Sequence, residues 1–150
     1  MPPRISVRPA DIKPMLPWTV LAERDGPGHL VPTVIGSAVD DILRVSLTGL
    51  NLFDHWSEEL GAQMDEFYSS ITDTPCGGFM VRSLETSGGL LKDYISSLFP
   101  LVGASGKVDR VFGLISVSKE EPLLASFGRP EDIETSVTDM SFIDIGFGVP

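Results

Sequence analysis

Hydrophobic residues form two dense runs in the second half of the chain. Residues 92–102 and 108–119 are rich in β-branched and aromatic side chains, and the small residues 103–106 (Gly-Ala-Ser-Gly) separate the two runs. Strand-forming runs around a glycine-containing turn are typical of a β-hairpin. Because an isolated hairpin is only marginally stable in water, we expect the rest of the chain to cover or extend this one.

The clearest helical pattern lies at residues 57–72. Its apolar positions follow the i, i+4, i+7, i+8, i+11 spacing of one helix face, at Leu60, Met64, Phe67, Tyr68 and Ile71. Glu58 and Glu59 fall in the first turn, where the helix dipole favours carboxylates. The spacing predicts one long amphipathic helix with its apolar side against a core.

Shorter elements precede this helix. Residues 18–23 and 29–35 have strand character, and residues 37–44 predict a short helix. Residues 77–85 predict a third strand before the hairpin. Because a proline cannot donate to a strand ladder, Pro32 marks its strand as an edge or the site of a bulge.

The pattern weakens after Pro122. Pro130, followed by acidic residues up to Glu134, predicts a short helix, because proline is favoured at the first helical position. Residues 141–147 alternate and predict either a half-buried strand or a tail that docks on a partner. We find no internal repeat and no low-complexity segment.

Composition narrows the classes of protein to consider. The chain has 150 residues, the size of one domain, and its formal charge is −10 at pH 7. An anionic surface repels phosphate backbones, so we expect no nucleic-acid partner. No apolar run approaches the roughly 18 residues of a membrane span, and the start lacks an apolar signal core. With Cys76 as its one cysteine, the chain fits a reducing, cytoplasmic compartment.

The order of elements is two strands, short helices, one long helix and three strands. Six segments that follow one another in this order stand out: PADIKPMLP, WTVLAE, the Gly36-Ser37 junction, LTGLNLFDHWSE, PLVGASGKVDRVFGLISV and FIDIGFG. Taken together, these segments resemble those of a bacterial group of single-domain PAS proteins. The chain departs from that group at Pro32-Thr33, where an arginine is usual early in the second strand.

The resemblance implies an α+β fold with a five-stranded antiparallel sheet, helices on one face and a small cavity between them. It places the PAS core at residues 17–120, with an N-terminal extension at 1–16 and a C-terminal extension at 121–150. Residues 141–147 are the candidate for an extra strand in that extension. It also implies a role in sensing or in protein contacts.

The apolar face of the long helix and its neighbours predicts a pocket for a small apolar or aromatic ligand. The candidate residues are His55, Trp56, Met64, Phe67, Tyr68, Met80 and Leu98. Ordinary core packing is the alternative, and burying one such side chain contributes about 1.5–3 kcal/mol without any ligand. We expect no cofactor, because Cys76 lies outside an Asn-Cys-Arg-Phe flavin run and the long helix has no histidine for haem. We also expect no metal site.

The second strand of the hairpin is apolar on both of its sides. If Val111, Gly113, Ile115 and Val117 face one side, then Phe112 and Leu114 face the other. Both sides of the sheet then need cover, either from residues 1–18 or 123–150 of this chain or from another protein. The candidate residues for a partner or dimer contact are Val111, Phe112, Gly113, Ile115 and Val117.

These observations favour a stand-alone signalling module that acts in trans, as a regulator or adaptor of a bacterial sensor kinase or a related protein. A homodimer, modulation by a small ligand and recruitment to the cell pole by a partner stay open. The first alternative is a sensor whose main activity is ligand binding in the cavity. An enzyme using Tyr68, Asp93 or His55 is disfavoured, because the sequence shows no acid–base constellation.

Overall fold

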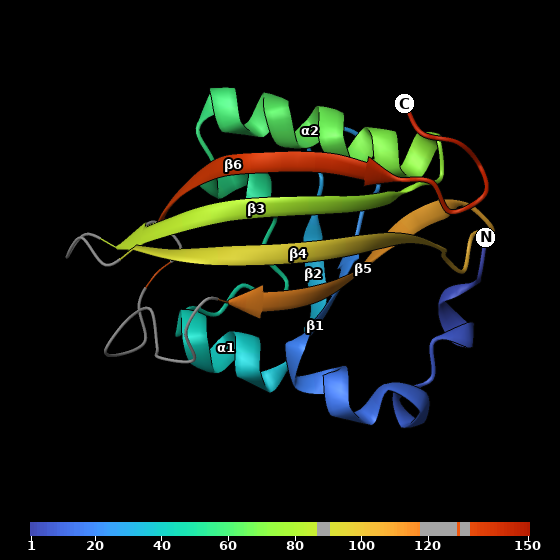
Figure 1. Ribbon diagram of the computed structural model, residues 1–150, viewed down its shortest axis with the longest axis horizontal. Coiled ribbons are helices and arrows are strands. Elements are labelled where there is room, and N and C mark those ends of the chain that lie inside the picture. The colour runs from blue at the N-terminus through green and yellow to red at the C-terminus, as the bar shows by residue number, and fades with distance from the viewer. Residues whose placement is uncertain (87–90, 118–128, 130–132) are drawn as a thin grey trace.

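The structure is a computed structural model that describes residues 1–86, 91–117, 129 and 133–150 (Figure 1). Its strands form one six-stranded antiparallel sheet in the order β2-β1-β5-β4-β3-β6. The strands are β1 (Thr19–Glu23), β2 (Val31–Ile35), β3 (Gly77–Thr86), β4 (Leu91–Val102), β5 (Val108–Val117) and β6 (Ile133–Ile143). The predicted hairpin forms β4 and β5 at the centre of the sheet. The α+β fold is confirmed, and β6 raises the strand count from the expected five to six.

Two α-helices, α1 (Ser37–Leu43) and α2 (Glu58–Asp73), pack on the same face of the sheet, which we call the inner face (Figure 1). The described residues also form the 3₁₀ helices η1 (Arg4–Ser6), η2 (Pro9–Trp18) and η3 (Leu52–His55). The core has two clusters, one under each α-helix. Under α2 lie Met80, Leu98 and Val111, and under α1 lie Leu84, Tyr94 and Ile115.

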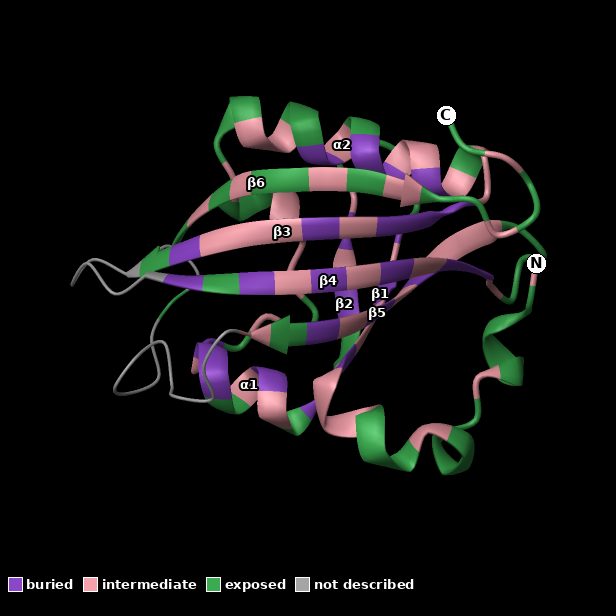
Figure 2. Cartoon of the chain, viewed as in Figure 1, coloured by how far each residue is buried: buried purple, intermediate pink, exposed green. Residues whose placement is uncertain are grey.

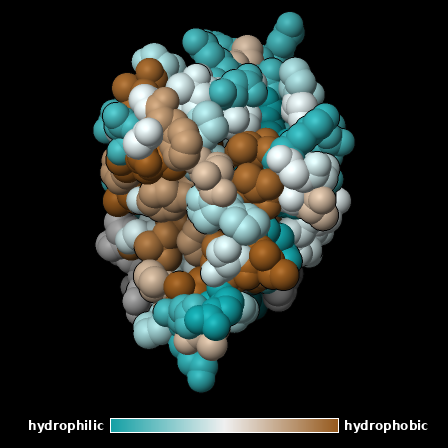
Figure 3. Space-filling view, turned by 90° about the vertical axis from the view of Figure 1, so that its right-hand side faces the viewer, coloured by the Kyte–Doolittle hydropathy of each residue, from teal (hydrophilic) through white to brown (hydrophobic). Residues whose placement is uncertain are grey.

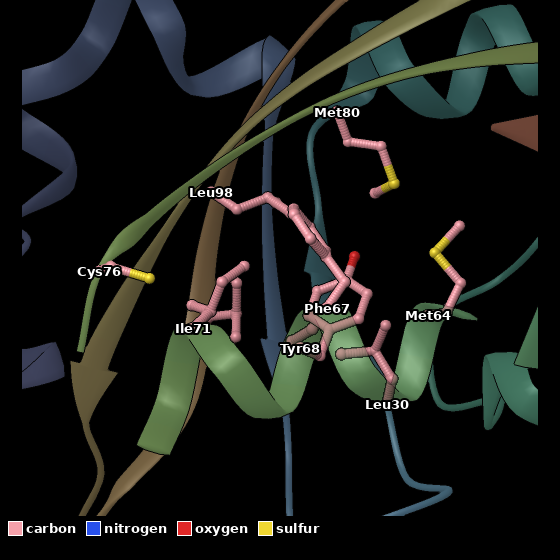
Figure 4. Packing of buried hydrophobic residues seen from close by; sticks show 10 residues of the cluster. Leu30, Met64, Phe67, Tyr68, Ile71, Cys76, Met80 and Leu98 are labelled. Atoms are coloured by element: carbon pink, nitrogen blue, oxygen red, sulfur yellow. The ribbon is translucent and has the colours of Figure 1, made fainter. Parts of the chain in front are cut away.

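The helix predicted at residues 57–72 is α2. It begins after Ser57, whose hydroxyl accepts a hydrogen bond from the Leu60 N–H at 3.2 Å. The side chains of its apolar stripe point toward Met80 and Leu98 of the sheet (Figure 4). A side chain at Gly78 would collide with Ile71 and Phe67, so this glycine lets α2 approach β3 closely.

Pro32 lies in a strand that is both an edge and bulged. β2 is the outermost strand on its side of the sheet. Its pairing with β1 shifts register between Leu21, which faces Val34, and Ala22, which faces Pro32. The missing N–H of Pro32 therefore falls where the ladder is already irregular.

The C-terminal part of the chain differs from its predicted form. The helix predicted from Pro130 is wrong where it can be seen, because Glu134 lies in β6, while residues 130–132 are outside the described residues. Ile133, Thr135 and Val137 are partly buried and alternate with the exposed Glu134 and Ser136. That period of two, with β-branched residues, outweighs the helix-start signal of the proline. The strand predicted at 141–147 instead spans Ile133–Ile143 and pairs with β3.

The N-terminal residues cross the other face of the sheet, which we call the outer face. Pro3 bridges to Val102 at the end of β4, and the Val102 N–H donates to the Pro2 carbonyl at 3.1 Å. Together with Leu21 and Phe112 of the outer face, residues of this segment enclose an open groove of about 360 Å³. One of the two predicted sources of cover, residues 1–18, therefore covers one margin of the outer face.

A buried arginine ties the β1–β2 connection to α2. Arg24 donates to the Asp65 carboxylate at 2.8 Å, to the Ser69 hydroxyl at 2.9 Å and to the His29 carbonyl at 3.1 Å. The same Asp65 oxygen accepts the Gly28 N–H at 2.8 Å. The Arg24 side chain is 2% exposed and that of Asp65 32%. A buried charge of this kind is stable only while its partners stay in place.

We expect Asp65→Asn to lower the free energy of unfolding by about 1–3 kcal/mol, because the buried Arg24 then loses its charged acceptor. The measurement is urea unfolding at pH 7. Glu66→Gln, the neighbouring exposed carboxylate on α2, is the matched control and should leave stability nearly unchanged. Equal losses in the two variants would contradict this role of Asp65.

The same pair predicts a pH dependence. Burial acts to raise the pKa of Asp65, but the Gly28 N–H and the hydrogen bond and charge of Arg24 outweigh it and lower this pKa below 3.8. The stabilisation is therefore complete above about pH 4 and is lost as the pH falls through the lowered pKa. We expect the stability difference between the unmodified protein and Asp65→Asn to shrink in acid. A difference that is constant down to pH 2 would refute the assignment.

Candidate functional site

The inner face of the sheet and the two α-helices enclose a cavity of about 120 Å³. Every strand of the sheet contributes to its wall, and so do α1, α2 and the segment around η3. Most of the lining is aliphatic, with Leu30, Val39, Leu43 and Ile115 among its members. A cavity with such walls is suited to a small, largely apolar molecule.

Arg82 is the cationic side chain of the cavity wall. It comes from β3, where the alternation of the strand places it on the same face as Met80 and Leu84. Its guanidinium carbon lies 4.9 Å from the centre of the Tyr94 ring, directly across the ladder on β4. Its Nε atom is buried and has no hydrogen-bond partner. The stacking occupies the flat side of the guanidinium, so an in-plane N–H donor is left over.

Two tyrosines stand beside this arginine. Tyr68 of α2 and Tyr94 of β4 both line the cavity, and both are buried. Burial raises the pKa of Tyr94 to about 12, although the charge of Arg82 acts in the other direction. Burial also raises the pKa of Tyr68, again against the charges of Arg82 and Arg24. Both phenols are therefore neutral at physiological pH and are polar groups in an otherwise apolar wall.

The pocket residues predicted from the sequence divide into two groups. His55, Trp56, Tyr68 and Leu98 line the cavity. Met64, Phe67 and Met80 lie in the core cluster under α2 and are not part of the cavity wall. Sequence reasoning missed Arg82, although the alternation of residues 77–85 places it on the face of Met80.

The cofactor candidates occupy different places. Cys76 is fully buried in the core cluster outside the cavity wall, and burial raises the pKa of its thiol. His55 has an exposed side chain and also lines the cavity, so it lies where the cavity meets solvent. Among the described residues, no three His, Cys, Asp or Glu side chains gather closely enough to hold a metal ion.

The outer face carries a second candidate site, which we call the outer apolar surface. It consists of Phe79 and Val81 of β3, Ile95 and Phe99 of β4, and Phe112 and Leu114 of β5, all partly exposed. Phe99 pairs with Phe112 across the ladder, and Ile95 pairs with Val81. Figure 2 shows buried and partly buried residues alternating along these strands. The surface is therefore continuous over the centre of the sheet.

Exposed apolar residues extend this surface at both sides. Val34 on β2 is 49% exposed, and Ile143 on β6 is 41% exposed and lies close to Gly77 and Phe99. Ile5 of the N-terminal segment is 83% exposed. Figure 3, which shows the side of the molecule that bears both termini, has hydrophobic residues gathered across its middle.

The contact residues predicted from the sequence fall on different faces. Phe112 lies on the outer face and belongs to the outer apolar surface. Val111, Gly113 and Ile115 line the inner cavity and are buried, and Val117 packs against the core cluster under α1. A partner cannot reach these four from the outer face, because successive residues of a strand point to opposite sides.

Acidic side chains border the outer apolar surface at one end. Glu85 and Asp93 are exposed on β3 and β4, and Glu134 and Asp139 are exposed on β6. Glu85 and Glu134 stand directly opposite each other in the ladder. At the other end Arg110 is paired with Glu23 at 3.2 Å. The surface is thus apolar at its centre and negative along one border.

Comparison with known proteins gives one match. A family model described as a PAS domain matches residues 1–116, which is most of the chain and includes the residues predicted as an N-terminal extension. No curated protein and no solved structure matches in the corresponding searches. Among the described helices, none has both the length and the apolar character needed to cross a membrane.

The two buried phenols predict an unusual alkaline titration. Tyr68 and Tyr94 are the two tyrosines of the chain, so the tyrosinate absorbance reports on this cavity alone. We expect the folded protein to show little ionisation near pH 10, where exposed tyrosine is half ionised. Because both folded-state pKa values are raised, the corresponding stability is full below about pH 10 and is lost as the pH approaches 12.

Protein unfolded in guanidinium chloride is the control for this titration and should ionise near pH 10. Folded protein that titrates with the same midpoint as the unfolded control would show that the phenols are not buried as described.

Proposed function

We propose, on the premise that the chain belongs to the PAS domain family, that this signalling or sensory module acts in trans through protein–protein contacts. The surface that makes the contact is the outer apolar surface. The single observation that carries the proposal is the continuity of six apolar, partly exposed side chains over the three strands β3, β4 and β5. Large apolar patches on a folded protein commonly mark sites of protein interaction.

The cover that the described residues give to this surface is incomplete. The N-terminal segment encloses one open groove with Leu21 and Phe112 and lines a second one with Ile95 and Leu114. β6 extends the sheet as an edge strand and does not fold over the outer face. Three aromatic rings, Phe79, Phe99 and Phe112, therefore stay partly exposed, and aromatic anchors supply much of the energy of protein interfaces.

The charge border favours one kind of partner. A second protein with an apolar patch flanked by lysine or arginine would complement the acidic border formed by Glu85, Asp93, Glu134 and Asp139. A sensor kinase or a related signalling protein with such a patch is our proposed partner. In a homodimer formed through this surface, the acidic borders of the two copies would repel each other unless the geometry kept them apart. We also propose a cytoplasmic location, with recruitment to the cell pole by the partner.

A second candidate function is ligand sensing in the inner cavity. The observation that favours it is the buried, unpartnered Nε of Arg82 in the cavity wall. A ligand that binds one conformation better than another would shift their populations, so both functions can operate in one molecule.

We also propose that the module works without catalysing a reaction. The support is the placement of two of the three residues considered for acid–base chemistry, while the third, His55, lines the cavity together with Tyr68. Tyr68 lies in the inner core, whereas Asp93 is exposed on the outer face, where it accepts a hydrogen bond from Ser83. The sheet separates these two side chains, so they cannot act on the same substrate.

Phe112→Glu and Leu114→Glu are expected to weaken partner binding at least tenfold, because each places a charge in the centre of the outer apolar surface. The measurement has two steps. Quantitative affinity capture from native cells identifies proteins that bind the unmodified protein and are lost with both variants. The affinity of the purified partner is then measured by calorimetry.

Gln63→Glu is the matched control, since it adds the same charge to an exposed position on α2, away from the sheet. The control should bind like the unmodified protein, and all variants must keep cooperative unfolding. Analytical ultracentrifugation in parallel detects a homodimer that dissociates with the outer-face variants. Folded outer-face variants with unchanged binding and unchanged oligomeric state would refute the proposal.

A further inference from the structure

We propose that the inner cavity binds a small monocarboxylate, whose anionic group accepts from the Nε–H of Arg82 and whose apolar part packs on the aliphatic wall. This inference deepens the second candidate function by naming the class of ligand. It does not depend on the outer apolar surface, which is tested separately.

The first argument is the state of Arg82. Its Nε is buried without a hydrogen-bond partner, and among the described ion pairs none includes Arg82. A buried N–H donor on a charged group is costly to leave unpaired. The Tyr94 ring, whose centre lies 4.9 Å from the guanidinium carbon, holds this group at the cavity wall before any ligand arrives. An acceptor with negative charge satisfies both the donor and the charge.

The chain itself provides a comparison for this arginine. Arg24, which directly follows β1, is another arginine buried on the core side, but it has the carboxylate of Asp65 and three further acceptors around it. Arg24 thus shows how this protein satisfies a buried guanidinium that serves the fold. Among the described residues, no carboxylate is paired with Arg82 in the way that Asp65 is paired with Arg24. Arg82 instead lines the cavity.

The second argument is the size and lining of the cavity. Its volume is about 120 Å³, and an apolar cavity of roughly 150 Å³ is enough to hold benzene. The ligand therefore has about five or six non-hydrogen atoms. Apart from Arg82, the wall offers polar groups on His55, Trp56, Tyr68, Tyr94, Ser96 and Thr135 among many aliphatic side chains. A short aliphatic acid fits such a cavity, because its carboxylate can face the polar groups and its hydrocarbon chain can pack on the aliphatic side chains.

The third argument is charge. Among the described residues that line the cavity, Arg82 is the one lysine or arginine, so these residues match a single negative charge and not a second one. Asp40 of α1 acts with its negative charge on Tyr94 of the wall, although it does not itself line the cavity. That neighbour also disfavours a dianion such as a phosphate ester.

The test compares straight-chain carboxylates, from ethanoate to hexanoate, with the corresponding primary amides. The amide keeps the shape of the acid but carries no charge. Binding is measured by protein-observed NMR titration at pH 7 and constant ionic strength. We expect an optimum at intermediate chain length and about tenfold tighter binding of the acid than of its amide.

Arg82→Met keeps much of the side-chain stem and removes the charge, so the acid and its amide should then bind equally. Arg110→Met is the matched control, because Arg110 is paired with Glu23 and Asp109 on the outer face, and it should keep the preference. Arg82→Lys should keep part of the preference and serves if Arg82→Met does not fold.

Three results would overturn the inference. These are equal affinity for acids and amides in the unmodified protein, no saturable binding of any member of the series, and a preference for acids that survives in folded Arg82→Met. Each of them leaves the contact through the outer apolar surface unaffected, since that proposal has its own variants.

Discussion

The two central strands of the sheet carry apolar side chains on both faces, and the rest of the structure follows from that constraint. On the inner face, Leu98, Val111 and Ile115 are covered by α1 and α2. On the outer face, Phe99, Phe112 and Leu114 are partly exposed, and the described N-terminal segment reaches Phe112 and Leu114 only at the edges of two grooves. Burial of one such side chain contributes about 1.5–3 kcal/mol, so the half-covered face retains a substantial capacity for binding.

The same strands connect the cavity to the outer apolar surface. Val111 and Gly113 line the cavity, and Phe112 between them points to the outer face. Likewise, Arg82 of the cavity wall lies next to Val81 of the outer apolar surface on β3. The residues that line the cavity are therefore immediate neighbours of residues that make the proposed contact, and a molecule bound in the cavity would touch the former. Differential affinity for two arrangements of these strands is all that a ligand needs to shift the contact.

Much of this fold could be predicted from local patterns. The apolar stripe of α2, the central hairpin and the irregular position of Pro32 each have a period or a backbone restriction that acts over a few residues. The conformation around Glu134 could not be predicted in this way, because pairing with β3 decides it. A proline followed by acidic residues predicts a helix start from local sequence alone. It does not report whether a neighbouring strand, here β3, has an unpaired edge that the segment can join.

The site was less accessible to sequence reasoning. Apolar residues of a pocket and of a packed core have the same pattern, so Met64 and Met80 could not be separated from Tyr68 and Leu98 before the structure. Arg82 could have been placed on the inner face by alternation along β3, but its lack of a partner depends on residues distant in the sequence. For the hairpin, the alternation of side chains along each strand shows which residues share a face of the sheet. It does not show which of the two faces the helices cover.

The central claim is that another protein covers the outer apolar surface in the cell. Ser97 lies at its centre, between Leu114 and Phe79, and Ser97→Cys is nearly isosteric. The native Cys76 is buried, with a raised pKa of its thiol, so it should react slowly. The most direct measurement is the maleimide labelling rate of Ser97→Cys in native cell extract and in purified protein, with Ala62→Cys on exposed α2 as reference. We predict protection of position 97 in the extract but not of position 62, and equal labelling of position 97 in both samples would contradict the claim.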